Sequence, residues 1–369
     1  MGGMSRAGAA RKLAAAAAYG GGGLSLIGAG LYGVLRTEAK VARKIIGDPL
    51  PDPVPDPTGW YGRGRPGPAK KIALLGDSSA AGYGVDRVEE TPGALLASGV
   101  AEQGDRRVYL RTFCVVGAVT AELSSQIDSA LLIEPDVAMI LIGANDVTHV
   151  TPPSQSVRHL SEGVRRLREA GVAVVVGTCP DLGTIKPIAP PLKQVARAWS
   201  RRLAAAQTIA VIEEGGRTIS LGSILGPEFA AAPALLFGPD QFHPSAAGYR
   251  ALVRLLLPSV LAALGLAPDD ETETVKIRGE GILPVTRAAI QAVNETGTEL
   301  DGTEVGGSRL GIRGLWVELR HRRRRPQTEG VAPEDDDTDA QTDAHEQAHD
   351  PEPATDEPVD DAAPSGTGT

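Results

Sequence analysis

Three residues of this chain have side chains of the kind that nucleophilic catalysis uses. Ser78 supplies a hydroxyl shortly after the apolar run 72–75, and Asp240 and His243 lie three residues apart much further along the chain. An unperturbed imidazole has a pKa of about 6.5, so His243 could take a proton from a serine hydroxyl and return it near neutral pH. The Asp240 carboxylate could reach the other ring nitrogen and fix the tautomer. Read alone, Ser78 is also explained as a capping residue at a strand-to-helix turn.

The elements that would position these residues alternate along the chain. Short apolar runs, typical of buried parallel strands, are separated by segments with helical periodicity. This alternation predicts helices on both faces of a parallel sheet, right-handed crossovers and the strand order 2-1-3-4-5. The predicted fold class is α/β, a flavodoxin-like three-layer α/β/α sandwich with a central five-stranded parallel sheet. We expect strands at 72–75, 108–116, 137–142, 172–176 and 217–220, and helices at 92–104, 118–132, 155–170, 192–214 and 245–264.

Two more residues fall at the ends of predicted strands. Gly117 follows the second strand and Asn145 follows the third, while His243 comes just before the last helix. The carboxyl ends of parallel strands share one edge of a sheet, where ligands bind in open α/β folds. Together the segments GDSSAAGYG, VVGAVTAEL, IGANDVTH and DQFHPSAAGY resemble the four sequence blocks of the SGNH hydrolases, also called GDSL esterases and lipases. The resemblance covers about residues 70–266.

The resemblance implies a role for each of these residues. Ser78, His243 and Asp240 would form a catalytic triad, although some members of the family use a backbone carbonyl in place of the aspartate. The Ser78 N–H, the Gly117 N–H and the Asn145 side-chain amide would form an oxyanion hole. Each residue also has an ordinary explanation, as a turn glycine, a residue that tolerates positive φ or a loop carboxylate. Their joint occurrence at compatible strand ends favours the catalytic interpretation.

These residues predict a serine esterase or lipase that hydrolyses carboxylic acyl esters through an acyl-enzyme. That chemistry requires no metal and no organic cofactor, and the six histidines lack paired metal-ligand spacing. The alternatives are a carbohydrate O-acetylesterase and, from another class, a catalytically silent membrane-tethered binding protein. Nucleotide binding is disfavoured because GDSSAAGYG lacks a dinucleotide or P-loop spacing. Asp146, His149 and Asp181, near the same edge, are expected to be structural or solvent-facing.

The negative charge of the chain is concentrated in its last residues. The formal net charge is -9, but the segment 326–369 contains 14 acidic residues and no Lys or Arg. The 37 basic and the remaining 32 acidic residues therefore leave +5 on the rest of the chain. This near-neutral body gives no reason to expect a nucleic-acid partner.

Cys114 and Cys179 are the two cysteines of the chain, which excludes a disulfide framework. They fall near the ends of strands that would not be neighbours, so we expect two buried free thiols. The SGNH hydrolases often have an asparagine where this chain has Cys114, which leaves the local hydrogen bonding different from the family's pattern.

The chain divides into five predicted parts. The N-terminal segment 1–36 holds an uncharged stretch, 13–35, long enough to cross a bilayer, although its Ala and Gly content also fits a flexible leader. A Pro-rich linker, 37–69, precedes the hydrolase domain, 70–266. The extension 267–325 is expected to form a helix over 282–293, loops over 297–314 and an anchor at Trp316, Val317 and Leu319. The acidic tail, 326–369, has the composition of a disordered segment.

This organisation predicts a membrane-associated or exported protein of the cell envelope. The expected partners are an acyl-ester substrate and, through the segment 1–36, a membrane. The sequence does not predict an oligomeric state.

Overall fold

The structure is a computed structural model that describes residues 33, 37–38, 54–185, 188–222, 233–266, 281–303, 310–311 and 314–321. All of these belong to one compact unit, 1–324. The expectations for the uncharged stretch 13–35, for most of the linker before residue 54 and for the acidic tail 326–369 concern residues outside the described part, apart from Gly33.

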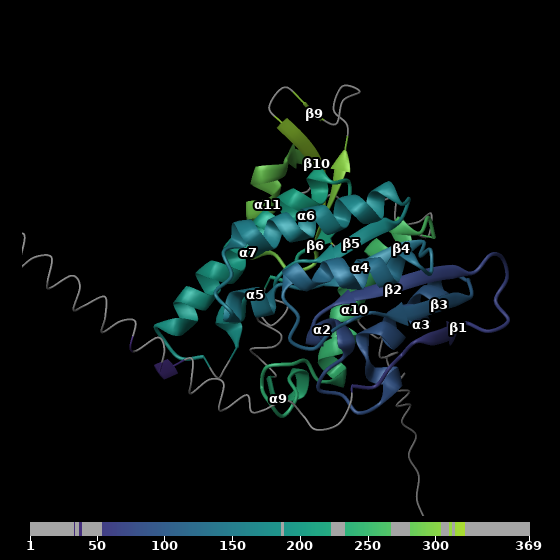
Figure 1. Cartoon of the computed structure of the whole chain (residues 1–369), viewed down its shortest axis with the longest axis horizontal. Coiled ribbons are helices and arrows are strands. Elements are labelled where there is room, and N and C mark those ends of the chain that lie inside the picture. The colour runs from purple at the N-terminus through teal and green to yellow at the C-terminus, as the bar shows by residue number, and fades with distance from the viewer. Residues whose placement is uncertain are drawn as a thin grey trace, which may run out of the picture. The chain divides into compact units, whose positions relative to one another are not determined.

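Five parallel strands form the centre of the sheet (Figure 1). They run in the spatial order β3-β2-β4-β5-β6, which is the predicted order 2-1-3-4-5. The register pairs Ile72 of β2 with Leu110 on one side and with Val137 on the other. These strands are β2 (Lys70–Gly76), β3 (Val108–Thr112), β4 (Val137–Leu141), β5 (Ala173–Gly177) and β6 (Arg217–Ile219).

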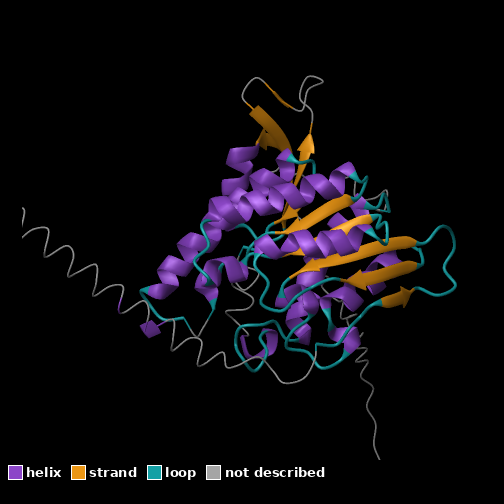
Figure 2. Ribbon diagram, viewed as in Figure 1, coloured by secondary structure: helices purple, strands orange, loops and turns teal. Residues whose placement is uncertain are grey.

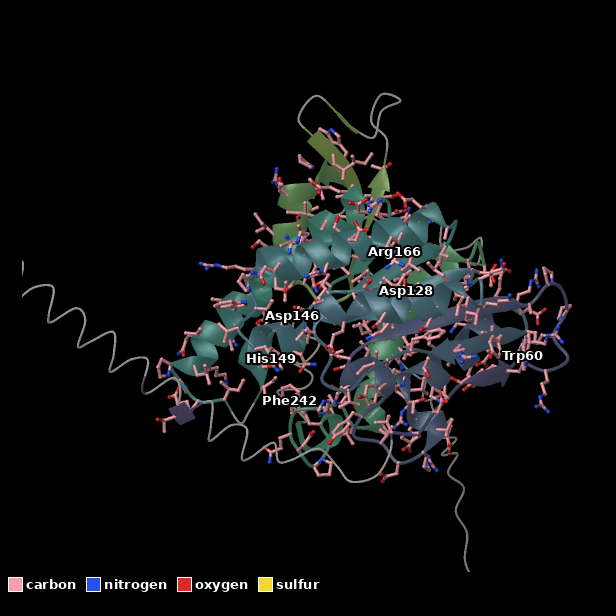
Figure 3. All side chains as sticks on the ribbon, viewed as in Figure 1. Trp60, Asp128, Asp146, His149, Arg166 and Phe242 are labelled. Atoms are coloured by element: carbon pink, nitrogen blue, oxygen red, sulfur yellow. The ribbon has the colours of Figure 1, made fainter. Side chains whose placement is uncertain are left out.

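Helices cover both faces of this sheet, which gives the predicted three layers (Figure 2). One apolar cluster joins α3 and α10 to one face, and a second joins α4, α6 and α7 to the other. Every side chain of β4 is buried, because both faces of the strand are covered. An ion pair between Arg166 of α6 and Asp128 of α4 ties two helices of one layer together (Figure 3). The long helices are α3 (Pro92–Gln103), α4 (Leu123–Leu131), α6 (Pro153–Glu169), α7 (Leu192–Glu213) and α10 (Ala246–Ala263).

Short helical turns follow the strands at their carboxyl ends. They are α2 (Ser78–Ala81) and η1 (Val88–Glu90) after β2, η2 (Thr120–Glu122) after β3, α5 (Ala144–Thr148) after β4, η3 (Leu182–Thr184) after β5 and α9 (Pro233–Leu236) after β6. Among the described residues, α10 alone is long and apolar enough to cross a membrane. Its buried Leu256 and Val260 pack in the same cluster as Leu96 of α3, so it serves as a core helix.

The sheet is wider than the five strands that the sequence predicts. Residues 59–61, which lie within the predicted linker 37–69, form β1 (Gly59–Tyr61), which pairs antiparallel with β3. The segment expected to be loops contains β8 (Thr298–Thr303), which pairs antiparallel with β6. Beyond it lie β10 (Gly314–His321) and β7 (Gly281–Pro284), with β9 (Leu310–Gly311) paired to β10. The helix expected over 282–293 is α11 (Val285–Asn294), preceded by β7.

The C-terminal extension is therefore part of the hydrolase sheet. Val317 and Leu319 of β10 are fully buried with Leu300, which confirms them as anchors, and Trp316 is half-buried. The buried Glu299 carboxylate accepts hydrogen bonds from Arg217 of β6 at 3.1 Å and from Ser259 of α10 at 2.7 Å. Because a carboxylate is costly to bury unless it is paired, these contacts fix β8 against the parallel strands.

Candidate active site

Ser78 lies at the carboxyl end of β2, in the first turn of α2. Asp77 precedes it as the N-cap, and its Oδ1 accepts a hydrogen bond from the Ser79 N–H at 2.9 Å. The turn before it requires glycine, because Gly76 has φ +139° and a Cβ there would lie 1.9 Å from the Leu141 carbonyl oxygen. The close approach of β2 and β4 thus sets the point at which the chain turns into α2 and positions the buried Ser78.

Ser78, His243 and Asp240 are joined by hydrogen bonds. The distance from His243 Nε2 to Ser78 Oγ is 2.9 Å, and His243 Nδ1 lies 2.6 Å from Asp240 Oδ2. Because a carboxylate only accepts, Nδ1 carries the proton and Nε2 is left to accept one from the serine hydroxyl. This is the arrangement that a serine nucleophile with a histidine base requires.

The loop from Asp240 to His243 is held by its own carboxylate. Asp240 Oδ1 accepts hydrogen bonds from the backbone N–H groups of Phe242 at 2.9 Å and His243 at 3.0 Å. Burial favours the neutral acid, but the bonds from the His243 side chain and these N–H groups outweigh it and lower the pKa of Asp240. The carboxylate therefore stays charged at neutral pH and faces the ring that would become an imidazolium.

Two aromatic rings enclose the imidazole of His243, which is buried. The ring of Tyr83 lies 4.4 Å away between centroids, and the ring of Phe242 meets the imidazole edge-on at 4.8 Å. The Tyr249 hydroxyl of α10 donates to the Tyr83 carbonyl at 2.8 Å and so anchors the loop that carries Tyr83. Tyr83 and Phe242 were not predicted to contribute to the site, although they lie inside the segments GDSSAAGYG and DQFHPSAAGY.

Gly117 and Asn145 lie on the loops that follow β3 and β4. Gly117 is exposed and has φ +84°, a conformation that glycine adopts at no steric cost. Asn145 begins the first turn of α5 and donates one Nδ2–H to the Ala118 carbonyl at 3.0 Å. A primary amide has two such protons, so the second remains available to a ligand. That hydrogen bond also links the Gly117 loop to Asn145.

About half of this chain is similar to known proteins. The model of the GDSL-like lipase/acylhydrolase family matches residues 74–251. Residues 74–251 therefore form a domain of the GDSL-like lipase/acylhydrolase family. Over 195 residues it is 45% identical to a GDSL-like esterase of Mycobacterium tuberculosis, an alignment that spans 52% of this chain and 62% of the relative.

Solved structures similar to the GDSL domain include hydrolases of low sequence identity. A structure of TesA is 21% identical and covers 53% of this chain and 99% of its own, with a TM-score of 0.43. An acetylxylan esterase from Geobacillus stearothermophilus, solved as a catalytic mutant, is 16% identical and covers 53% of this chain and 94% of its own, with a TM-score of 0.42.

Asp146 fixes the two loops of the GDSL domain that carry Gly117 and Asn145. Its carboxylate is buried and accepts hydrogen bonds from the Thr120 N–H at 3.0 Å, the Thr120 hydroxyl at 2.8 Å and the Ser156 hydroxyl at 2.6 Å. Asp146 therefore has the structural role expected of it. His149, which is exposed, places Nδ1 2.8 Å from the Asn145 carbonyl oxygen. Asp146 and His149 lie near each other in Figure 3.

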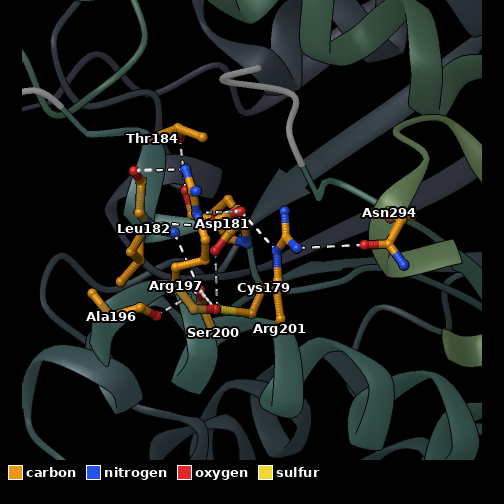
Figure 4. A network of polar contacts seen from close by, with 12 residues as sticks. Cys179, Asp181, Leu182, Thr184, Ala196, Arg197, Ser200, Arg201 and Asn294 are labelled. Carbon is orange, nitrogen blue, oxygen red and sulfur yellow. Dashed lines mark hydrogen bonds and ion pairs between the residues drawn. The ribbon is translucent and has the colours of Figure 1, made fainter. Parts of the chain in front are cut away.

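Asp181 is also structural, at the start of η3. Its buried carboxylate accepts hydrogen bonds from Arg201 Nε at 2.9 Å and the Gly183 N–H at 2.9 Å, and Arg197 Nε lies 3.5 Å away (Figure 4). Arg201 in turn donates to Asn294 of α11 at 3.4 Å. The network fixes the loop after β5 to α7 and to the C-terminal extension.

Two buried glutamines brace the strand ends in the same way. Gln126 of α4 accepts from the Gly76 N–H at 2.8 Å and donates to the Gly76 carbonyl at 3.1 Å. Gln207 of α7 accepts from the Cys179 N–H at 2.7 Å and donates to the Ile142 carbonyl at 3.0 Å. Each side chain forms hydrogen bonds with backbone groups at the end of a strand, where the regular pairing of the sheet stops. A buried glutamine on the apolar face of a predicted helix is the sequence signal that could have identified them.

An apolar pocket of about 670 Å³, including the space that opens to solvent, lies beside the candidate active site. It contacts Asp77 and Ser79, which flank Ser78, and Phe242 and Pro244, which flank His243. Burial in this setting raises the pKa of Asp77 to about 6. The remaining lining comes mainly from the carboxyl ends of β4, β5 and β6 and from α10: Leu141, Ile142, Ala144, Gly177, Thr178, Pro180, Leu182, Ile185, Leu221, Gly248 and Leu252.

Both cysteines are free thiols. Cys179 is buried as expected, whereas Cys114 is only half-buried. The Cys114 thiol donates to the Leu74 carbonyl at 3.4 Å, and burial raises the pKa of both thiols. In the described part of the chain, no cluster of three His, Cys, Asp or Glu side chains could hold a metal ion.

Proposed function

We propose that this chain is a serine esterase that hydrolyses carboxylic acyl esters, with Ser78 as the nucleophile. The observation that carries the proposal is the pair of hydrogen bonds that joins Ser78 to His243 at 2.9 Å and His243 to Asp240 at 2.6 Å. A serine hydroxyl is unreactive without a base, and here the base is oriented by a charged carboxylate. Membership in the GDSL-like lipase/acylhydrolase family supports the same reaction class.

The proposed reaction has two halves. Ser78 Oγ attacks the ester carbonyl while His243 Nε2 takes the hydroxyl proton. The tetrahedral intermediate collapses as His243 returns that proton to the leaving alcohol, which gives an acyl-enzyme. Water then attacks the acyl carbonyl, His243 again takes and returns a proton, and the carboxylic acid leaves with Ser78 restored.

The proposed oxyanion hole consists of the Ser78 N–H, the Gly117 N–H and the second Nδ2–H of Asn145. These donors come from α2, from the loop after β3 and from α5. Asp146 and the bond from Asn145 to Ala118 hold the loop after β3 and α5 together. Neutral donors that are fixed in advance stabilise the developing charge at no cost of reorganisation. Loss of one such donor elsewhere has reduced turnover by roughly 10²- to 10³-fold.

The pocket favours an acyl chain over an acetyl group as the part of the substrate that binds. Its lining is largely apolar and it touches the neighbours of both Ser78 and His243. Transfer of each methylene from water to such a surface contributes about 0.8 kcal/mol, which an acetyl group cannot exploit. Lipid acyl esters are therefore the proposed substrates.

The test is hydrolysis of p-nitrophenyl esters from acetate to palmitate by the full chain, with Ser78→Ala as the inactive variant. Ser129→Ala is the matched control, because Ser129 is an exposed serine on α4. We expect activity that Ser78→Ala abolishes and an optimum above acetate. An optimum at acetate would favour an O-acetylesterase instead.

A fluorophosphonate probe gives an independent test of the nucleophile. We expect it to label Ser78 in the wild-type chain, as peptide mass spectrometry would detect. Folded wild-type protein that neither reacts with the probe nor hydrolyses any ester would contradict the proposal and favour a binding protein.

A further inference from the structure

Exposed apolar side chains surround the candidate active site. Five of these side chains are 42–64% exposed and lie on the segments that follow the parallel strands β3, β4, β5 and β6. We call this set the apolar rim: Val115 and Val116 after β3, Val150 after β4, Val195 in the first turn of α7 after β5, and Leu235 in α9 after β6. In Figure 1, α5, α9 and α2 gather at one end of the parallel strands. The apolar rim thus belongs to the edge that holds Ser78.

Val150 is held in an unfavourable conformation at this edge. It has φ +59°, where β-branched residues are genuine outliers, and its side chain is 62% exposed. The adjacent backbone is fixed, since the Thr151 N–H donates to the Asp146 carbonyl at 2.8 Å and the Val150 N–H to the Val147 carbonyl at 3.1 Å. Most of the valine side chain faces solvent, and asparagine or glycine would fit this backbone conformation better. Strain of this kind collects at functional sites.

The N-terminal part of the chain is tied to the same edge. Glu38 Oε2 accepts a hydrogen bond from the Leu192 N–H at 2.8 Å, and Leu192 is the first residue of α7, in the same turn as Val195. The uncharged stretch 13–35 ends three residues before Glu38. Three residues of chain span at most about 11 Å. A bilayer that held this stretch would therefore lie close to the apolar rim.

We propose that the apolar rim rests on the surface of a lipid bilayer, held there by residues 13–35. Arg36, Lys40, Arg43 and Lys44 follow that stretch directly, which matches a surface that contains anionic lipids. A surface of scattered aliphatic side chains around a site, beside a bilayer-length apolar segment, fits the boundary of lipid headgroups and acyl chains. This orientation does not depend on catalysis by Ser78. If the proposed function also holds, the substrates are acyl esters that reside in the membrane.

Hydrogen–deuterium exchange of the full chain tests the orientation. The vesicles contain phosphatidylcholine and phosphatidylglycerol in equal parts, and flotation verifies that the protein is bound. We expect slower exchange on vesicles in peptides that cover 114–119, 148–152, 192–196 and 233–237. Peptides around Leu132 and Ile282, which are exposed apolar residues away from this edge, should exchange at the same rate with and without vesicles.

Each contrary outcome overturns the proposal. Vesicle-bound protein whose rim peptides exchange as fast as in solution would mean that the rim faces water. Rim peptides that are already protected without vesicles would mean that the chain itself covers them. A chain that does not float with vesicles would exclude the membrane as the partner. The Ser78→Ala variant should give the wild-type exchange pattern, so that failure of the proposed catalytic role is distinguishable from failure of this proposal.

A matched pair of double variants measures the contribution of the rim. Val195→Gln with Leu235→Gln removes a β-branched side chain and a leucine from the rim, and Ile282→Gln with Leu132→Gln removes a comparable pair elsewhere. We expect the rim variant to lose the protection from hydrogen exchange that vesicles give. We also expect the ratio of its hydrolysis rate on a vesicle-embedded long-chain ester to its rate on a dissolved short-chain ester to fall on the order of tenfold. Equal behaviour of the two variants would contradict the proposal.

Discussion

Replacement of Asp77 by asparagine should stabilise this protein at alkaline pH. The Asp77 carboxyl is buried next to the apolar pocket, and burial raises its pKa from 3.8 to about 6. Asparagine is as good an N-cap as aspartate, so its Oδ1 can accept the hydrogen bond from the Ser79 N–H that Asp77 accepts now. The substitution therefore removes the buried charge and keeps the cap.

The magnitude and sign follow from the pKa. Between pH 3.8 and about 6 the folded protein binds more protons at Asp77 than the unfolded chain does, so the free energy of unfolding falls as pH rises through this window. Raising the pKa of Asp77 from 3.8 to about 6 lowers the free energy of unfolding by about 3 kcal/mol. This loss is complete above the pKa of the folded protein and absent below the pKa of the unfolded chain. The free energy of unfolding of Asp77→Asn should exceed that of wild type by up to about 3 kcal/mol at pH 8. This difference should be smaller by about 2 kcal/mol at about pH 4.5.

Urea unfolding of both proteins at the two pH values measures this difference. Asp86→Asn is the control, because Asp86 is an exposed aspartate on the loop after α2. We expect the stability gap between Asp77→Asn and wild type to widen from pH 4.5 to pH 8, while Asp86→Asn stays near wild type at both. An Asp77→Asn protein that is no more stable at pH 8 would show that the Asp77 carboxylate is better solvated or paired than its burial indicates.

Three further changes test other parts of the structure. Asp240→Asn should reduce kcat by roughly 10⁴-fold with little change in KM, because an amide N–H would face Nδ1 and favour the wrong tautomer; a loss under tenfold in steady-state assays would argue for another orienting group. Gln126→Leu should lower the free energy of unfolding in urea by about 1–3 kcal/mol, since the Gly76 N–H loses its bond to Gln126 while the Gly76 carbonyl keeps its bond from the Val115 N–H. Arg217→Met should lower the free energy of unfolding by about 3–5 kcal/mol, because it leaves the buried Glu299 carboxylate with one partner fewer. An unchanged urea midpoint in Gln126→Leu or in Arg217→Met would refute the reasoning for that variant.

The parallel centre of the fold could be predicted because its strands are buried on both faces. Residues 137–142 read as a continuous apolar run, and Val137–Leu141 forms a strand in which every side chain is buried. The proximity of Ser78 to His243 was predictable for a related reason. Strands that run parallel must end at one edge, so hydroxyl, amide and imidazole groups that follow different strands come together there.

The edges of the sheet could not be predicted by the same reasoning. The β8 sequence TELDGT has no apolar alternation, and what fixes it is a long-range contact between Glu299 and Arg217, which are 82 residues apart. Gly59–Tyr61 is too short to show a period, and it becomes a strand because β3 offers it an open edge. The helical pattern could have marked Gln126 as a polar residue on an apolar face, but its partners are backbone groups of Gly76, which no side-chain pattern reveals.

The position of β8 beside β6 has a consequence for how this protein is made. Until residue 303 has been synthesised, β6 is an edge strand whose unpaired N–H and C=O groups could pair with another chain. All of the candidate catalytic residues precede α10, which ends at Ala263, so the ribosome delivers them before it delivers the strand that pairs with β6. Nascent chains should therefore pass through an aggregation-prone interval that a chaperone would have to cover, and premature termination in the extension should be as harmful as a mutation in the core.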